Sequence, residues 1–260
     1  MKALIRRLLP ESFLERWHFF RHHAQDVHIP KGSVTFFEDG LLTQQSAHFL
    51  EDEKFKRAYE LGAATNSWKG ASIRWRAYVA CWAGQHAALL PGDFVECGVN
   101  RGGLARAIVD YVRFETLNKK FFLVDTFKGL VPEYLTPDEK AKGLLDHFNY
   151  YEDNPLATVR ETFAPFPNVV VVEGAVPDIL PDIPSKEVAY LSLDMNCVLP
   201  EQKAAEYFWD RIVPGGIILS DDYGFNLHEE QRKMMDRFAA SRGVAVLALP
   251  TGQGIIFKPS

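Results

Sequence analysis

The second half of the chain alternates between two kinds of segment. From Asp93 onward, short apolar runs rich in β-branched or aromatic residues are separated by amphipathic stretches. Nearly continuous apolar runs are typical of strands covered on both faces, and helices between them imply right-handed crossovers and a parallel sheet. The predicted strands are Phe94–Val99, Phe121–Val124, Val169–Val172, Val188–Leu193 and Ile217–Leu219. The predicted helices are Leu104–Leu117, Glu201–Ile212 and Asn226–Arg242.

The end of the chain breaks this alternation. Val244–Leu249 and Ile255–Phe257 are apolar runs, and the Pro-Thr-Gly-Gln-Gly stretch between them is too short to hold a helix. Two strands joined by a glycine-rich turn form a hairpin, so the last strand must run antiparallel to its neighbour. We therefore predict an α/β, Rossmann-like sheet of seven strands, with five parallel βα units closed by a C-terminal antiparallel hairpin. This is the arrangement of the class I methyltransferases, and an ordinary dinucleotide-binding domain does not normally end this way.

The first ninety residues carry a different pattern. Ser46–Leu61 and Ser72–Leu90 have apolar residues at three- and four-residue spacing, which predicts helices. We expect a helical N-terminal extension or cap at residues 1–90 and one α/β domain at residues 91–260. Residues 1–25 mix bulky apolar side chains with arginines, so this segment could lie on a membrane surface, pack on the body of the protein, or contact a second subunit of a homo-oligomer.

Composition narrows the class of protein. The 260 residues are 47% hydrophobic and 24% charged, which is typical of a globular domain with enough apolar material for a core. A formal net charge of −5 argues against extended nucleic-acid binding, which needs a dense basic surface. No apolar run reaches the ~18 residues of a membrane-spanning helix. The three cysteines, Cys81, Cys97 and Cys197, lack metal-ligand spacing, and a reducing, cytoplasmic setting fits them best.

A glycine-containing loop follows the first predicted strand. It reads Glu96-Cys-Gly98-Val-Asn100-Arg-Gly102. This is not the G-x-G-x-x-G pattern of a pyrophosphate-binding loop. Asp125 ends the second strand, where an acidic side chain can accept hydrogen bonds from both ribose hydroxyls of an adenosine cofactor. Asp125 alone suits NAD equally well, but Glu96, the glycine spacing and the terminal hairpin together favour S-adenosylmethionine. An ordinary βα turn is the alternative interpretation of the glycine loop.

The turn after the third strand contributes to the same predicted site. Gly174 and Ala175 are placed to border an adenine ring, although a simple strand-capping turn explains them equally well. Residues 91–260 would then form the S-adenosylmethionine-binding domain. The candidate cofactor-binding residues are Glu96, Gly98, Asn100, Gly102, Asp125, Thr126, Gly174, Ala175 and Asp194.

Three aspartates follow two further strands. Asp194 comes after the fourth apolar run, and Asp221 and Asp222 come after the fifth. Because ligands bind outside the carboxyl ends of parallel strands, we expect these side chains to converge where a substrate lies. Carboxylate oxygens are hard ligands that suit Mg²⁺. The alternative for Asp221 and Asp222 is a solvated strand end with a helix-capping aspartate before Asn226.

Three stretches of the chain resemble the macrocin O-methyltransferase family. They are Gly92-Asp-Phe-Val-Glu-Cys-Gly-Val-Asn-Arg-Gly-Gly, Val124-Asp-Thr-Phe-Lys-Gly-Leu and Val213-Pro-Gly-Gly-Ile-Ile-Leu-Ser-Asp-Asp-Tyr-Gly. The family methylates sugar hydroxyls on antibiotics with the help of a metal ion and is related in fold to catechol O-methyltransferase. The resemblance covers about residues 70–260. It implies S-adenosylmethionine as donor, Mg²⁺ as cofactor and a hydroxylated, sugar-like acceptor.

The resemblance also assigns roles to individual residues. It implies that Asp194, Asp221 and Asp222 bind the metal, and that Glu96, Gly98 and Asp125 hold the cofactor. Family members usually carry a second aspartate two residues after the first one that follows the fourth strand, whereas this chain has Asn196 there.

These roles suggest a mechanism and its rivals. A divalent cation lowers the pKa of an alcohol, and we expect Asp194 to take the proton as the catalytic base. A catechol-like small-molecule O-methyltransferase is the first alternative. An NAD-dependent oxidoreductase is disfavoured by the glycine spacing and the hairpin. A catalytically silent binding protein is the third alternative, which Asn196 keeps open.

A long insert, Val131–Phe166, separates the second and third predicted strands. Its length predicts a lid or specificity element, and a crossover helix with surface aromatics is the alternative. The aromatic and histidine residues of interest in it are Tyr134, His147, Tyr150 and Tyr151. His147 and His228 are further candidate bases. In the helix before the first strand, Trp75, Arg76 and Tyr78 could close over the cofactor, or that helix could simply pack on the sheet.

Overall fold

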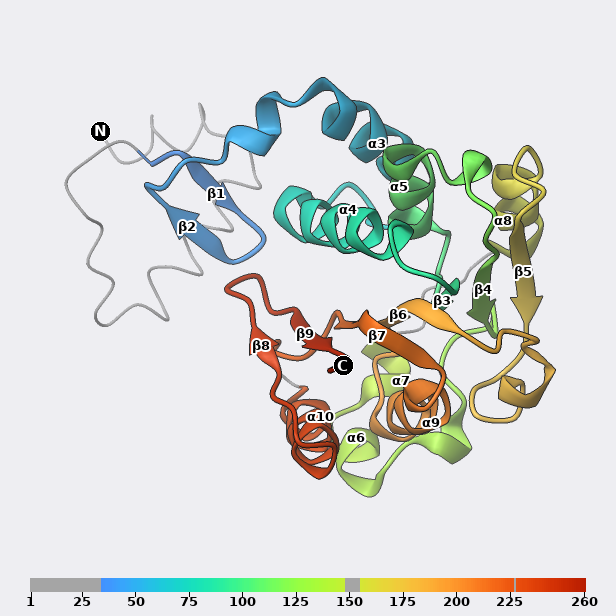
Figure 1. Ribbon diagram of the computed structural model, residues 1–260. Helices are drawn as coiled ribbons and strands as arrows, with labels where there is room; N and C mark the ends of the chain where they lie inside the picture. The colour runs from blue at the N-terminus through green and yellow to red at the C-terminus, as the bar shows by residue number, and fades with distance from the viewer. Residues whose placement is uncertain (1–33, 148–154, 227) are drawn as a thin grey trace, which may run out of the picture.

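The computed structural model describes residues 34–147, 155–226 and 228–260. Its centre is a seven-stranded sheet in the order β5-β4-β3-β6-β7-β9-β8 (Figure 1). The strands are β3 (Asp93–Cys97), β4 (Phe121–Asp125), β5 (Val169–Glu173), β6 (Val188–Leu193), β7 (Ile212–Ser220), β8 (Leu247–Ala248) and β9 (Gly254–Phe257). Strands β3 to β7 pair in parallel, and β9 runs antiparallel to both β7 and β8. The predicted class I methyltransferase fold, with its terminal hairpin, is confirmed.

Helices cover both faces of the sheet, because alternate strand residues point to opposite sides. In β3, Phe94 packs in a core with one set of helices, while the next residue, Val95, packs in a second core with another set. The first set is α3 (Glu53–Ala63), α4 (Arg74–Ala88), α5 (Gly103–Val112) and α8 (Pro155–Phe163). The second set is α9 (Val198–Trp209) and α10 (Glu229–Ser241) (Figure 1).

The order of the strands fixes where a ligand can bind. The chain runs outward from β3 through β4 to β5, and then returns to the other side of β3 to form β6 and β7. The reversal leaves a crevice at the carboxyl ends of β3 and β6, and ligands of open α/β sheets bind at such a switch point. The loops that we singled out in the sequence all lie at this edge.

The segment before β3 differs from its prediction. We expected helices throughout residues 1–90, but β1 (Phe36–Glu38) and β2 (Leu41–Thr43) form a two-stranded antiparallel hairpin. Both turn residues, Asp39 and Gly40, have positive φ (52° and 76°), which is the geometry of tight two-residue hairpin turns. Three-residue strands are too short to show a period in the sequence. Residues 1–33 lie outside the described residues, so the expectations for residues 1–25 are not addressed.

The predicted helices around residues 46–90 correspond to η1 (His48–Glu51), α3 and α4. They share one hydrophobic core with the sheet, and the boundary that we placed between residues 90 and 91 stays a prediction. The remaining short helices are η2 (Phe114–Thr116), η3 (Pro132–Tyr134), α6 (Pro137–Ala141), α7 (Leu144–His147) and η4 (Leu180–Asp182). Within the described residues, every helix is too short or too polar to cross a membrane.

Candidate active site

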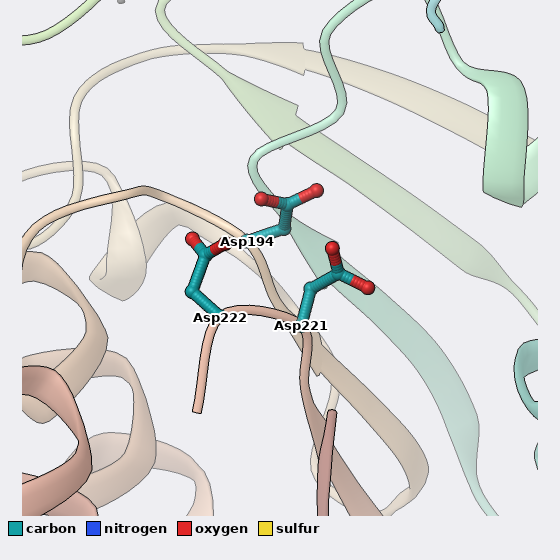
Figure 2. Close-up of side chains that lie close together, drawn as sticks. All are labelled: Asp194, Asp221 and Asp222. Carbon is teal, nitrogen blue, oxygen red and sulfur yellow. The ribbon is translucent and has the colours of Figure 1, made fainter. Parts of the chain in front are cut away.

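Three aspartates meet at the carboxyl edge of the sheet, as predicted. Asp194 follows β6, Asp221 and Asp222 follow β7, and the last residues of these strands, Leu193 and Ser220, lie side by side in the parallel register. One carboxylate oxygen from each aspartate lies within 4.8 Å of the others. Figure 2 shows the three side chains grouped above the ends of the two strands. The neighbouring positions of β6 and β7 therefore convert distant sequence positions into one acidic cluster.

The cluster is electrostatically costly without a positive charge. Burial, and then the negative charges of Asp221 and Asp222, raise the pKa of Asp194 well above its ordinary value. Burial also raises the pKa of Asp222 to about 6, although the nearby His228 opposes this shift. Asp222 is 7% exposed, and within the described part of the chain its Oδ2 atom has no hydrogen-bond partner. An unpaired, buried carboxylate oxygen beside two other carboxylates fits a hard divalent cation such as Mg²⁺.

The candidate cofactor loop lies next to this cluster. Glu96 is buried in β3, and its Oε2 atom lacks a hydrogen-bond partner among the described residues. Burial, followed by the charges of Asp221 and Asp125, raises the pKa of Glu96. The backbone turns sharply at Gly98, which has a φ of 90°. A Cβ atom on Gly98 would lie 1.9 Å from the carbonyl oxygen of Asp194, so the loops after β3 and β6 touch backbone to backbone.

Asp125 organises this loop with its own carboxylate. Its Oδ2 accepts hydrogen bonds from the backbone N–H groups of Val99 (2.7 Å) and Asn100 (2.8 Å), and its Oδ1 accepts one from Phe127 (2.7 Å). Burial raises the pKa of Asp125, and these backbone hydrogen bonds oppose the rise. We expected Asp125 to accept ribose hydroxyls. In the structure its visible role is to fix the backbone of two adjacent loops, and ribose binding stays a prediction.

A cavity of about 450 Å³ joins the two groups of residues. Its volume lies within the range of roughly 300–1,000 Å³ that is typical of small-molecule sites. The predicted residues that line it are Glu96, Gly98, Asn100, Asp125, Thr126, Gly174, Ala175, Asp194, Asp221 and Asp222. Among the predicted cofactor-binding and metal-binding residues, Gly102 alone does not line it: it precedes α5, and a Cβ there would lie 2.6 Å from the ring of Phe163.

Comparison with known protein families supports the assignment that the sequence motifs suggested. A family model described as Macrocin-O-methyltransferase (TylF) matches residues 29–248. The chain belongs to this family. The resemblance of its three sequence motifs to macrocin O-methyltransferases is therefore confirmed.

Two curated relatives and one solved structure illustrate the similarity. A mycinamicin III 3''-O-methyltransferase from Micromonospora griseorubida is 29% identical over 145 residues, which cover 52% of this chain and 56% of the relative. An 8-demethyl-8-(2,3-dimethoxy-alpha-L-rhamnosyl)-tetracenomycin-C 4'-O-methyltransferase from Streptomyces olivaceus is 29% identical over 145 residues, covering 53% of this chain and 55% of the relative. The chain thus matches a little over half the length of each. The structure of the O-methyltransferase NovP has the same fold, with a TM-score of 0.60 at 19% identity over 71% of this chain and 80% of that one.

This macrocin O-methyltransferase family member carries Asn196 where family members usually carry a second aspartate. Asn196 adopts a positive φ of 56°, and its side-chain amide donates a 3.3 Å hydrogen bond to Oδ1 of Asp194. Behind it, the buried Glu201 accepts hydrogen bonds from the backbone of Met195 (3.1 Å) and from Gln231 (2.9 Å). Burial and the charge of Asp222 raise the pKa of Glu201 to about 8. The hydrogen bonds of the buried Glu201 therefore hold the loop that carries Asp194. The sequence analysis did not identify this residue.

The other candidates fall in different places. Tyr134 and His228 line the cavity, and Tyr134 donates a 2.7 Å hydrogen bond to Asp178. Tyr150 and Tyr151 lie outside the described residues, as does the side chain of His147. Trp75 and Tyr78 pack against Phe49, at ring distances of 4.9 and 4.2 Å, so these two aromatics serve helix packing rather than the cavity.

Arg76 lines the cavity, as one of its two sequence interpretations allowed, but its contacts with Asp221 and Asp39 and the role of Gln253 were not predicted. The guanidinium group of Arg76 lies in the cavity wall and binds both Asp221 and Asp39, the first turn residue of the β1–β2 hairpin. Gln253, in the turn before β9, donates a 2.9 Å hydrogen bond to Oδ1 of Asp221. No spacing rule connects these positions, because the residues that contact one another are 32 to 145 residues apart along the chain.

Proposed function

We propose that this chain is an S-adenosylmethionine-dependent, Mg²⁺-dependent O-methyltransferase that acts on a hydroxyl group of a sugar or glycosylated small molecule. The observation that carries the proposal is the convergence of Asp194, Asp221 and Asp222, whose Oδ2 atom has no hydrogen-bond partner among the described residues, on the cavity that also contains the Glu96 loop. Membership of the macrocin O-methyltransferase family and the names of the two relatives support a glycosylated acceptor.

The residues on the cofactor side would bind and orient the donor. S-adenosylmethionine, when bound, supplies an electrophilic methyl group. The absence of a Cβ atom at Gly98 lets the loop after β3 lie against the backbone of Asp194 at the cavity, and the buried Glu96 offers an acceptor to a polar group of the donor. The hydrogen bonds from the loop to Asp125 keep this part of the cavity preorganised before the donor arrives.

The residues on the other side would handle the acceptor hydroxyl. Asp194, Asp221 and Asp222 would hold a divalent cation, which makes a bound hydroxyl more acidic. Asp194 lies where the two sides of the cavity meet, because its backbone contacts Gly98 while its carboxylate faces the other two aspartates. It is therefore the residue that we assign to accept the proton from the hydroxyl group. Asn196 would orient Asp194 by its hydrogen bond.

A methyl-transfer assay tests the proposal. The protein is incubated with S-adenosylmethionine and a panel of glycosylated small molecules and phenols, with Mg²⁺ or with excess EDTA, and S-adenosylhomocysteine is quantified. We expect Mg²⁺-dependent turnover of a glycosylated acceptor. Turnover that resists the chelator would contradict the cation's role, and turnover of phenols alone would favour the catechol-like alternative. Binding of S-adenosylmethionine without turnover of any acceptor would favour a silent binding protein.

A further inference from the structure

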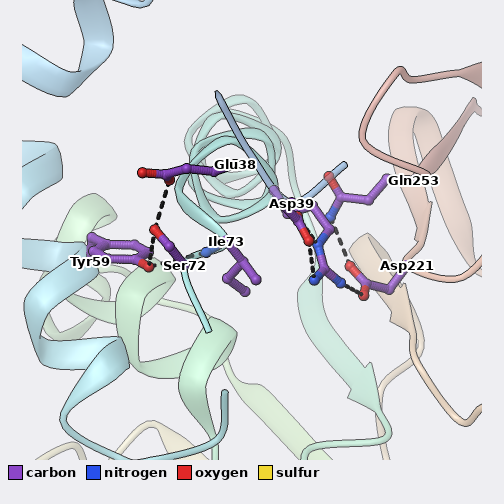
Figure 3. Close-up of polar contacts among 8 residues, drawn as sticks. Glu38, Asp39, Tyr59, Ser72, Ile73, Asp221 and Gln253 are labelled. Carbon is purple, nitrogen blue, oxygen red and sulfur yellow. Dashed lines mark hydrogen bonds and ion pairs between the residues drawn. The ribbon is translucent and has the colours of Figure 1, made fainter. Parts of the chain in front are cut away.

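Arg76 connects the acidic cluster to a hairpin outside the main sheet. Its Nε and Nη2 atoms donate to the two carboxylate oxygens of Asp39, at 2.6 and 3.0 Å. Its Nη1 atom donates to Oδ2 of Asp221 at 2.8 Å. Figure 3 shows this chain of contacts running from the labelled Asp39 to the labelled Asp221. The planar guanidinium thus uses one edge to grip Asp39 and presents its remaining end to Asp221.

These ion pairs are shielded from water. The side chains of Arg76, Asp39 and Asp221 are 16%, 10% and 6% exposed. The guanidinium also lies over the ring of Phe225, 5.0 Å from its centre. Shielded, bidentate pairs hold their geometry better than surface ion pairs, which contribute little. The contact is therefore suited to fix the direction of a carboxylate.

Asp221 is held from both sides and can still bind a ligand. Arg76 donates to Oδ2, and Gln253 from the turn before β9 donates to Oδ1 at 2.9 Å. An ionised carboxylate has about four acceptor positions on its two oxygens, so two hydrogen bonds leave room for a cation. The charges also allow the Arg76 guanidinium and a divalent ion to be present at the same time. Together they carry three positive charges, against four negative charges on the ionised side chains of Asp39, Asp194, Asp221 and Asp222.

We infer that Arg76, anchored by Asp39 in the β1–β2 hairpin, is a positioning residue that fixes the Asp221 carboxylate for cation binding. The inference rests on the proposed function, because it assigns the acidic cluster to a cation. It makes the hairpin, which lies outside the seven-stranded sheet, a structural part of the cation site. The opposite arrangement, in which Arg76 occupies the place of the cation and competes with it, predicts the reverse sign in the experiment below.

The chain offers variants that separate these arrangements. Arg76→Lys keeps the positive charge but removes the planar group that reaches both carboxylates at once. Asp39→Asn removes the anchoring charge, and asparagine tolerates the positive φ of this turn. Arg74→Lys is the matched control: Arg74 joins the same helix, α4, to the same hairpin through Glu38, but does not contact the acidic cluster.

The experiment is a titration of each full-length variant with Mn²⁺, read by electron paramagnetic resonance. Binding of S-adenosylhomocysteine by calorimetry and thermal unfolding are measured in parallel. We expect Arg76→Lys to weaken Mn²⁺ binding about 10- to 100-fold, as is typical when an outer partner of a metal ligand is lost. Asp39→Asn should weaken it in the same direction by a smaller factor. Arg74→Lys should bind Mn²⁺ within about twofold of the wild type, and S-adenosylhomocysteine binding should not change in any variant.

Three results would overturn the inference. If Arg76→Lys binds Mn²⁺ as tightly as the wild type or more tightly, Arg76 does not position Asp221. If Arg74→Lys loses as much affinity as Arg76→Lys, the effect comes from docking of the hairpin in general. If the wild type itself fails to bind Mn²⁺, both this inference and the cation-dependent function fail. If the wild type binds Mn²⁺ but methylates no acceptor, the function fails while the titration still decides the role of Arg76.

Discussion

Two acidic strand ends line the same cavity, and the chain treats them in opposite ways. Asp125, at the end of β4, accepts three backbone hydrogen bonds from its own and the neighbouring loop. Asp222, after β7, is buried with an oxygen that nothing in the described chain satisfies, next to two other carboxylates. Backbone donors satisfy the Asp125 carboxylate within the folded chain, whereas Oδ2 of Asp222 is left for a partner that the described residues do not supply. Asp125 therefore has a structural role in the site, whereas Asp222 is a candidate ligand-binding residue.

The largest expected effect comes from removing the aspartates after β7 that we assign to the cation. Asp221→Ala and Asp222→Ala should each lower methyl transfer at least about a thousandfold, because a metal ion contributes several kcal/mol to such reactions. The measurement is turnover at saturating Mg²⁺, with S-adenosylhomocysteine binding by calorimetry to show that the other side of the cavity is intact. Asp182→Ala, an exposed aspartate that does not line the cavity, is the control. Unchanged turnover in either variant would remove the cation from the mechanism.

The next largest effect comes from removing the Asp125 carboxylate at the end of β4. Asp125→Ala should lower the free energy of unfolding by about 3 kcal/mol, because several N–H groups lose an ionised acceptor. Asp125→Asn, which keeps an acceptor oxygen, should lose less. Chemical denaturation without any ligand measures both. A loss below about 0.5 kcal/mol for the alanine variant would show that these hydrogen bonds do not organise the loop.

The third prediction has the opposite sign to the second, because removing the Asp222 charge should stabilise the folded protein. Asp222→Asn should stabilise the protein by about 2 kcal/mol at pH 8 in EDTA, because the wild-type carboxylate is buried beside like charges. The pKa of Asp222 is raised from its ordinary value of 3.8 to about 6 in the folded state, so its penalty is full above pH 6 and declines as the pH falls from 6 towards 3.8. The two proteins should therefore converge in stability only below about pH 4. A less stable Asp222→Asn protein at pH 8 would contradict the electrostatic account.

The smallest effect concerns the pH dependence of cation binding. Metal ligands must be deprotonated, and the pKa of Asp222 is about 6, so the affinity for Mn²⁺ should fall about tenfold between pH 7 and pH 5. Electron paramagnetic resonance of Mn²⁺ at several pH values measures this change. Constant affinity over this interval would indicate that Asp222 is not a ligand.

Much of the fold could be predicted from the sequence because its strands are covered on both faces. Val188–Leu193 was predicted with the bounds that β6 has, and the helix predicted at Ser72–Leu90 contains α4. The β1–β2 hairpin was missed, although Asp39-Gly40 is a strong turn signal, since its strands of three residues carry no visible period.

The candidate site was predictable to the same extent. Parallel strands bring their carboxyl ends together, so Asp194 and Asp221 could be placed side by side without coordinates. The contacts of Arg76, Asp39 and Gln253 could not be predicted, because they depend on how a hairpin and a turn dock onto the edge of the sheet. Local sequence patterns do not encode such docking.

The backbone contact at Gly98 has a practical consequence for redesign. No side chain fits between Gly98 and the carbonyl of Asp194. The loop after β3 and the loop after β6 are therefore in direct backbone contact, and neither can move without the other. Attempts to enlarge the pocket for bulkier acceptors should leave this seam untouched. Val131 and Tyr134, which line the cavity from the insert, are the residues to remodel.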